Sequence, residues 1–289
     1  MTVREKGYTH WDGELKPARH PWWPIARLGI KLAFKKKYFK FIYFSAFIPA
    51  FAFLVGIYIS ERIEDFQWMV RGSTRILEMN PRFFNYYFSS DFLLFMMVMI
   101  LLASGAGLIS DDLKYNSLQL YLARPLRKKD YLAGKAAVLV FFIFSLTILP
   151  GLVFIVFKLL FAGNFSFLSS YPWLPLAVIG HSLLVTVFFC LYTLLLSSLS
   201  KNRRYVSILI FGVYVFSDIL HGFFSENFKQ PAFALVSLKA NLQQMGAFFF
   251  KQKPVFPVAW HFSLFILVSL CLLAAVVLSR KVKGVEVVK

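Results

Sequence analysis

The sequence holds few of the residues on which catalytic and metal sites are usually built. Of its 289 residues, only two are cysteines and five are histidines. Cys190 and Cys271 both lie inside apolar runs, without the spacing of a disulfide framework or a metal site, so we expect them to pack as small hydrophobic side chains. There is no His-Glu-x-x-His pair and no Gly-x-Ser-x-Gly turn. We therefore predict no catalytic, cofactor-binding or metal-binding residue in this chain.

A phosphate-binding loop is also missing. Such a loop requires Gly-x-x-x-x-Gly-Lys followed by Ser or Thr, because its backbone N–H groups and its lysine hold the nucleotide phosphates. Gly134-Lys135 is followed by Ala136 and lacks the upstream glycine. We therefore expect any ATPase that works with this chain to be another polypeptide.

Acidic residues are scarce. There are 14 Asp and Glu against 32 Lys and Arg, which gives a net charge of +18. A basic balance is typical of nucleic-acid binding. Here, however, the basic residues lie between long apolar blocks, where anionic lipid and the positive-inside rule place them. We therefore expect the chain to contact membrane lipid and no nucleic acid.

Long apolar runs dominate what is present. The sequence is 58% hydrophobic and only 16% charged, and its apolar residues form blocks of the length that crosses a bilayer, about 20 residues per helix. This predicts an all-α integral membrane protein with six transmembrane helices in a domain over 41–279. The predicted spans are 41–59, 92–109, 136–157, 173–199, 205–224 and 258–279.

The distribution of charge predicts the orientation. If all six spans cross, the segments 1–40, 110–135, 200–204 and 280–289 share one side and hold 10, 6, 3 and 4 Lys or Arg, together 23. The other side holds nine. By the positive-inside rule both termini are cytoplasmic, and omitting the weak fifth span would spoil this bias.

Two segments outside the spans have amphipathic spacing. In the N-terminal segment 1–40, a helix predicted from Ile25 to Lys40 and opened by Pro24 suits the cytoplasmic membrane interface, although a basic flank that only sets topology is the alternative. A short external helix is predicted before the sixth span, because five apolar residues there follow a 3-4-3-4 spacing. These are Leu235, Leu238, Leu242, Met245 and Phe249.

Proline and small residues predict where the spans deform or approach one another. Pro49 and Pro150-Gly151 lie inside the first and third spans and predict kinks, which serve either as hinges or only for packing. The small residues at 103–107 predict close helix packing.

The segment 110–135, between the second and third spans, carries the main functional signal. It contains an apolar-rich piece that is broken at Arg124-Pro125, then a basic run beginning at Arg127, and then a new helix near Asp130. The leucines of the apolar piece are Leu118, Leu120 and Leu122. Exposed leucines ringed by charge on a loop favour docking to a partner.

This stretch resembles the permeases of type 2 ABC exporters, a class that includes multidrug, polysaccharide and nitrous-oxide-reductase-maturation permeases. Their pattern runs small-small-Ile-x-x-Glu, Gly-Thr-Leu, Leu-x-x-Pro-x-x-Arg and Gly-Lys. Here 107–111, 117–118, 123–127 and 131–135 correspond to it. Aspartates replace the usual glutamate, and Asn116-Ser117 replaces Gly-Thr. The six-span topology and the two amphipathic segments extend the resemblance over the whole chain.

The resemblance implies a permease in the cell membrane, inner or plasma, that works with ATPase subunits. A second permease subunit, identical or different, would face it across a two-fold axis, and the segment 113–126 would dock on the ATPase. The spans would then move between inward-open and outward-open states. The implied ATPase contacts are Asp111, Asp112, Leu118, Leu120, Leu122, Arg124, Pro125 and Arg127. For Arg127 and the two lysines after it, a purely topological role is the alternative.

One acidic residue lies inside a predicted span. Asp218 in the fifth span has His221 one helical turn away, so the two can face the same side. An intramembrane acid is a functional hypothesis by default, and this pair is a candidate for the translocation path. The alternative is that the fifth helix breaks near Asp218 as it leaves the membrane.

Other functions remain open at this point. A secondary transporter would usually show buried charges on several spans, and a membrane-embedded enzyme would need paired catalytic residues; neither is evident. A membrane anchor or mechanical transmitter for an external partner is a third alternative.

Overall fold

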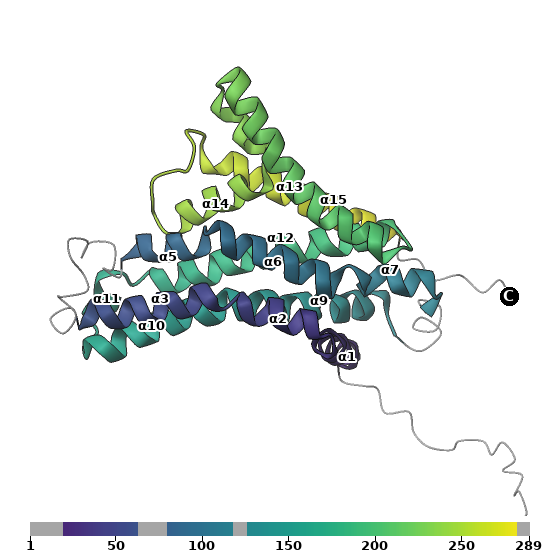
Figure 1. Cartoon of the computed structure of the whole chain (residues 1–289), viewed down its shortest axis with the longest axis horizontal. Coiled ribbons are helices and arrows are strands. Elements are labelled where there is room, and N and C mark those ends of the chain that lie inside the picture. Colours follow the sequence, from purple (N-terminus) through teal and green to yellow (C-terminus); the bar gives the residue numbers. More distant parts are fainter. Residues whose placement is uncertain (1–19, 63–79, 118–125, 282–289) are drawn as a thin grey trace, which may run out of the picture.

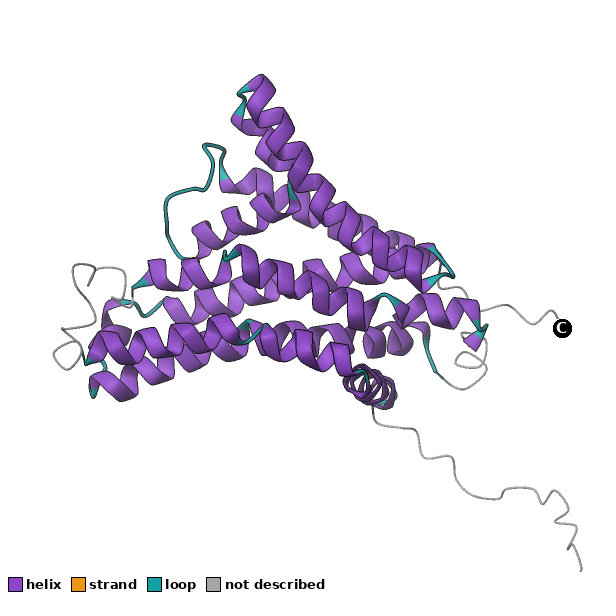
Figure 2. Ribbon diagram, viewed as in Figure 1, coloured by secondary structure: helices purple, strands orange, loops and turns teal. Residues whose placement is uncertain are grey.

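The described part of the chain is a layered bundle of helices. The computed structural model describes residues 20–62, 80–117 and 126–281, and these residues form helices joined by short loops, without strands (Figures 1 and 2). Within these residues, six helical stretches are long and apolar enough to cross a membrane, and each overlaps one predicted span; the fourth begins one residue and the sixth two residues later than predicted. They are Lys37–Glu61, Asp91–Lys114, Lys128–Ala162, Leu174–Leu199, Arg203–Phe228 and Trp260–Lys281. The prediction of six spans is therefore confirmed, whereas the side on which each terminus lies stays a prediction.

The first three spans are interrupted and the last three are continuous. The interrupted spans are α2 (Lys37–Ser45) with α3 (Ile48–Glu61), α6 (Asp91–Gly105) with α7 (Gly107–Lys114), and α9 (Lys128–Leu146) with α10 (Ile148–Ala162). The continuous ones are α12 (Leu174–Leu199), α13 (Arg203–Phe228) and α15 (Trp260–Lys281). Pro49 and Pro150 lie just after two of the breaks, so the kinks predicted from them are confirmed.

At the break in the third span, a side chain from another helix hydrogen-bonds to the backbone carbonyl that lacks a helical donor. Pro150 has no backbone N–H, so it leaves the carbonyl of Leu146 without its usual helical donor. The hydroxyl of Tyr87, in the short helix α5 (Pro81–Phe88), donates to this carbonyl at 2.8 Å from a buried position. The Thr147 hydroxyl donates to the Ile143 carbonyl at 2.8 Å. The kink is thus held by a specific tertiary hydrogen bond.

Small residues bring α12 close to its neighbours at the centre of the bundle. A Cβ atom added to Gly105 of α6 would lie 2.4 Å from a methyl carbon of Thr193 in α12. One added to Gly151 of α10 would lie 2.6 Å from a methyl carbon of Val178. The close packing predicted at 103–107 is therefore confirmed.

The N-terminal helix α1 (Trp22–Lys35) lies across the direction of the spans and packs on α9 (Figure 1). It ends five residues earlier than predicted, because Lys36 is extended (ψ 121°) and α2 begins at Lys37. Its contact with α9 depends on Gly134, where an added Cβ would lie 2.8 Å from Cβ of Ile25 and 2.9 Å from the Trp22 carbonyl oxygen. Its position in lipid stays a prediction.

Helix α14 (Leu238–Phe249) occupies the predicted external segment and follows the 3-10 helix η1 (Pro231–Val236). The apolar stripe accounts for only part of its burial, since Asn241 and Gln244 are buried as well. Asn241 donates to the Leu235 carbonyl at 2.7 Å, and Gln244 donates to the Val258 carbonyl at 2.7 Å. α14 is therefore enclosed on two sides rather than lying on a surface by one face. The short helix α11 (Ser166–Ser170) completes the helices of the described residues.

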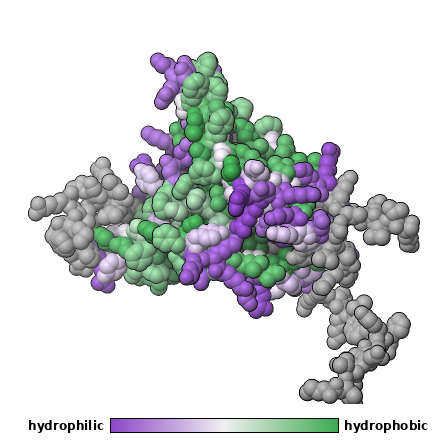
Figure 3. Space-filling view, turned by 45° about the vertical axis from the view of Figure 1, so that its right-hand side comes forward, coloured by the Kyte–Doolittle hydropathy of each residue, from purple (hydrophilic) through white to green (hydrophobic). Residues whose placement is uncertain are grey.

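The surface agrees with a membrane location. Many large apolar side chains of the spans are exposed, including Phe51, Leu176, Ile208 and Phe265. In the space-filling view, hydrophobic residues cover much of the bundle, and hydrophilic residues gather around the end that carries α1 and α7 (Figure 3). The chain is therefore a multi-pass membrane protein.

The close contact at Gly134 predicts that Gly134→Ala destabilises the protein. The added methyl must displace a backbone carbonyl, so we expect a loss of about 1–3 kcal/mol, typical of overpacking. The matched control is Gly212→Ala in α13, where nothing lies within 4 Å of the added atom. That change should be neutral or stabilising by about 0.5–1 kcal/mol. Thermal unfolding in detergent, followed by fluorescence-detected gel filtration, compares the two; equal midpoints would contradict the packing described here.

Candidate functional sites at the two ends of the bundle

The break between α6 and α7 lies directly before the predicted coupling segment. Because α7 begins at Gly107, the N–H group of its third residue has no acceptor within its own helix, and that of its fourth faces only the carbonyl of the N-cap residue Ala106. The hydroxyl oxygen of Ser197, in α12, accepts from both of them, Ile109 N at 3.0 Å and Ser110 N at 3.1 Å. It also donates to the Ala106 carbonyl at 2.9 Å. One buried serine from another span therefore caps the start of α7.

Two cationic side chains hydrogen-bond to a backbone carbonyl in the last turn of α6. The Ala103 carbonyl is one of the last four of that helix and lacks a helical donor. Lys36 Nζ donates to it at 3.2 Å and Arg203 Nη2 at 3.0 Å. Burial lowers the pKa of Lys36, as does the charge of Arg203, while Asp111 acts in the opposite direction. The break between α6 and α7 is thus tied to the α1–α2 junction and to the start of α13.

An ion pair joins α7 to α9 on the two sides of the coupling segment. Asp112 Oδ2 accepts from the Tyr131 hydroxyl at 2.6 Å and lies 2.6 Å from Lys135 Nζ. The side chains of Lys135 and Asp112 are only 11% and 13% exposed. Leu113 and Leu126 pack against the buried ring of Tyr131. The two flanks of 118–125 are therefore fixed to each other.

The helix α7 ends with a residue in the left-handed conformation. Asn116, just beyond Lys114 and Tyr115, has φ 53°. A left-handed residue after the last helical turn is a common way to end a helix, and asparagine is the residue that most readily replaces glycine there. Asparagine in place of the glycine of the resembling permeases is therefore a conservative change in backbone terms.

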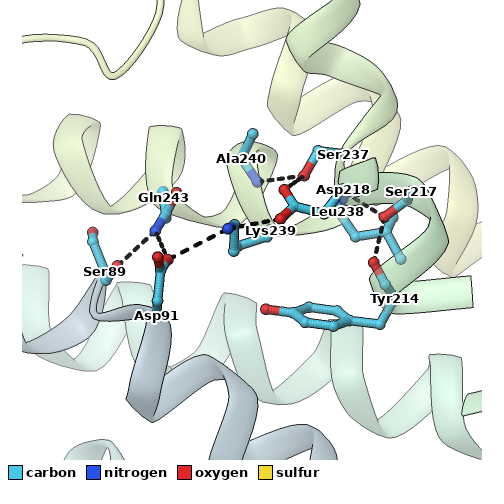
Figure 4. Close-up of polar contacts among 10 residues, drawn as sticks. All are labelled: Ser89, Asp91, Tyr214, Ser217, Asp218, Ser237, Leu238, Lys239, Ala240 and Gln243. Carbon is cyan, nitrogen blue, oxygen red and sulfur yellow. Dashed lines mark hydrogen bonds and ion pairs between the residues drawn. The ribbon is translucent and has the colours of Figure 1, made fainter. Parts of the chain in front are cut away.

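At the opposite end of the bundle, a polar network joins α6, α13 and α14 (Figure 4). Lys239 Nζ lies 2.8 Å from Asp218 Oδ2 and 3.6 Å from Asp91 Oδ1. Ser237, the N-cap of α14, donates to Asp218 Oδ1 at 2.9 Å. Burial lowers the pKa of Lys239, but its hydrogen bonds and charge interactions with Asp218 and Asp91 outweigh this and raise it overall.

The comparison with protein families identifies the class of the protein. Residues 26–279, most of the chain, match the family described as ABC-2 family transporter protein. The chain belongs to this family. Among curated proteins, no match was found. The protein is therefore an ABC-2 permease, a membrane-spanning subunit of an ABC transporter, and its family implies association with an ATPase subunit and dimerisation.

Only part of the predicted coupling site of this permease can be placed. Leu118, Leu120, Leu122, Arg124 and Pro125 lie outside the described residues. Of the rest, Asp111 lines a hollow of about 290 Å³ beside α1, Asp112 forms the ion pair with Lys135, and Arg127 is exposed just before α9. α9 begins at Lys128, so Asp130 lies in its first turn and is not its N-cap, a position where a carboxylate still favours the helix dipole.

For the predicted translocation pair, Asp218 has different partners from the one expected. Among the described residues, its hydrogen bonds and ion pairs go to Ser237 and Lys239 rather than to His221. The alternative of a helix that breaks near Asp218 is wrong, because α13 continues to Phe228. The carboxylate instead anchors α14 to the C-terminal half of α13.

Sequence reasoning missed the residues that hold both sites together. Ser197, Lys36, Arg203 and Lys239 carry no motif, and the two cations reach Ala103 across sequence separations of 67 and 100 residues. The sequence shows Ser197 only as a polar residue at the end of an apolar run. It shows Lys36 and Arg203 only as basic residues at the start of two spans. Neither signal identifies a partner.

Removing the Ser197 hydroxyl should destabilise the permease. Ser197→Ala leaves two buried N–H groups without their acceptor, which costs about 1–3 kcal/mol. Ser198→Ala is the matched control, because that hydroxyl only donates to the Leu195 carbonyl of its own helix. We expect a lower unfolding midpoint for Ser197→Ala and little change for Ser198→Ala. Indistinguishable midpoints would show that Ser197 does not cap α7.

The network around Lys239 predicts unequal coupling of this lysine to its two carboxylates. A double-mutant cycle of Lys239→Gln with Asp218→Asn should give a coupling energy of about 1 kcal/mol, because this pair is short and partly buried. The cycle with Asp91→Asn should give less, since that contact is longer and the Asp91 side chain is 71% exposed. Chemical unfolding in detergent measures both. A larger coupling to Asp91 would contradict this arrangement.

Proposed function

We propose that this permease belongs to an exporter in which ATP hydrolysis, on a separate nucleotide-binding subunit, moves a substrate across the membrane. The observation that carries the proposal is the Asp112–Tyr131–Lys135 cluster, which fixes the two flanks of the coupling segment to each other. Because its two flanks are joined, a movement of the ATPase that displaces the coupling segment would displace α7 and α9 together.

The orientation with both termini in the cytoplasm is part of this proposal. The cations Lys36, Arg203 and Lys281 all lie at the end of the bundle that carries α7, where Lys281 Nζ reaches the Ser198 carbonyl at 3.5 Å. By the positive-inside rule this end faces the cytoplasm. The coupling segment then lies on the side where ATP is available.

The permease itself contributes no nucleotide chemistry in this scheme. ATP is bound by the partner subunit, because the chain carries no phosphate-binding loop. A second permease subunit completes the pathway, in line with the dimerisation that the family implies. The multidrug-like and nitrous-oxide-reductase-maturation-like permeases are the proposed relatives within the family.

Acidic substitutions in the coupling segment test this function. Leu118→Asp with Leu122→Asp places charge on an apolar docking surface, and we expect the ATPase to be lost when the tagged permease is purified from native membranes. The control places aspartate at Val285 and Val287 of the C-terminal tail, predicted on the same side, and should retain the ATPase. Photolabelling with an azido-ATP analogue detects the bound subunit, and cysteine accessibility checks that all six spans remain inserted.

If the unmodified permease carries no ATPase from native membranes, the proposed function is wrong. An anchor for an external partner or a secondary transporter would then be the remaining explanations. Retention of the ATPase by the double aspartate variant would instead place the docking surface elsewhere on the chain.

A further inference from the structure

A hollow of about 480 Å³ lies between α6, α13 and α14, beside the polar network at the outer end of the bundle. Its lining combines aromatic rings with charged groups. The aromatic residues are Phe92, Phe95 and Tyr214, and the charged ones are Asp91, Asp218 and Lys239. A concave site with apolar walls and a few convergent polar groups is the usual form of a small-molecule site.

The charges around this hollow do not balance. Lys239 lies 2.8 Å from Asp218, and the second oxygen of Asp218 accepts from Ser237, so each oxygen of this carboxylate has a partner. Asp91 lies 3.6 Å from Lys239 and accepts a neutral hydrogen bond from Gln243 at 2.8 Å. Two carboxylates thus share one lysine, which leaves a net charge of −1 around the hollow, and the more distant of the two, Asp91, has a side chain that is 71% exposed.

A buried hydroxyl faces the same space. Tyr214 is 4% exposed, and its phenol oxygen has no hydrogen-bond partner within the described part of the chain. Figure 4 shows this hydroxyl pointing beneath Lys239 toward the space beside Asp91. Since buried polar atoms normally have a partner, an unpaired hydroxyl that lines a cavity indicates a ligand that supplies one.

The aromatic walls define the rest of the ligand. Phe92 and Phe95 are 41% and 39% exposed although they lie on a helix that is otherwise largely buried. Their ring faces attract both alkyl chains and cations. The hollow therefore offers a carboxylate and a phenol oxygen for a cationic head group and apolar walls for a tail.

We propose that this hollow binds an amphiphilic primary amine, with its ammonium group held by Asp91 and the Tyr214 hydroxyl and its apolar tail against Phe92 and Phe95. An ammonium group donates one N–H to the carboxylate and another to the phenol oxygen, which satisfies both groups at once. This inference rests on the proposed function, because it names the class of substrate that the permease takes.

Binding of octylammonium to the purified permease in nanodiscs, without ATPase or nucleotide, tests the site. Isothermal titration against empty nanodiscs separates binding from partition into lipid. We expect Asp91→Asn to weaken binding about tenfold, because it removes a hydrogen bond between two charged groups. Tyr214→Phe should weaken binding about threefold, because it removes a hydrogen bond to a neutral hydroxyl. Glu226→Gln, which removes an exposed carboxylate from the same end of α13, should leave the affinity unchanged. 1-Octanol, which carries no charge, should bind at least about tenfold more weakly than octylammonium.

Tyr214→Phe keeps the test valid if Asp91→Asn disturbs α14. It removes only a hydroxyl that has no partner, so its unfolding midpoint should match that of the unmodified protein. Equal affinities for octylammonium and 1-octanol, or an Asp91→Asn variant that binds like Glu226→Gln, would overturn the proposal. Because no ATPase is present in this experiment, its failure would leave the co-purification test of the proposed function untouched.

Discussion

The permease is shaped by the need to satisfy every backbone polar group without water. In the apolar core of a bilayer an unpaired carbonyl or N–H group is costly, so a helix can be interrupted there only where protein groups replace the lost hydrogen bonds. Two of the interrupted spans show these replacements directly. The Tyr87 hydroxyl donates to the Leu146 carbonyl, which lost its helical donor to Pro150. The Ser197 hydroxyl accepts from the N–H groups of Ile109 and Ser110 in the first turn of α7.

These replacement hydrogen bonds also fix how the helices are arranged. Ser197 belongs to α12, Tyr87 to α5, and the cations on the Ala103 carbonyl come from the α1–α2 junction and the start of α13. The breaks before α7 and α10 are thus points where distant parts of the chain meet. Since α7 has its own capping interactions, its direction is set by α12 and α13 as much as by α6, which places the coupling segment under the control of several spans.

The sequence predicted the parts of this structure that depend on local composition. Apolar runs identified all six spans, Pro49 and Pro150 identified two breaks, and the small residues near Gly105 identified a close contact, because each of these effects acts within a few residues. The break at Ala106 was not predicted, since no proline marks it and its support comes from Ser197. Likewise, Asn241 and Gln244 look like the polar face of an amphipathic helix, but both are buried and donate to backbone carbonyls in the segments before and after α14. The docking leucines of the candidate site lie outside the described residues, so their role stays a prediction.

The polar groups at the two ends of the bundle differ in a way that follows from their partners. At the end with α7, Lys36 and Arg203 both bond to the Ala103 carbonyl, so two cations converge on a neutral acceptor. At the other end, Lys239 lies between two carboxylates, and an excess of negative charge remains. A neutral carbonyl leaves no negative charge to attract a further cation, whereas two carboxylates that share one lysine keep an excess negative charge that attracts a cation from outside. The first end is therefore suited to transmitting movement between helices, and the second to receiving a charged ligand.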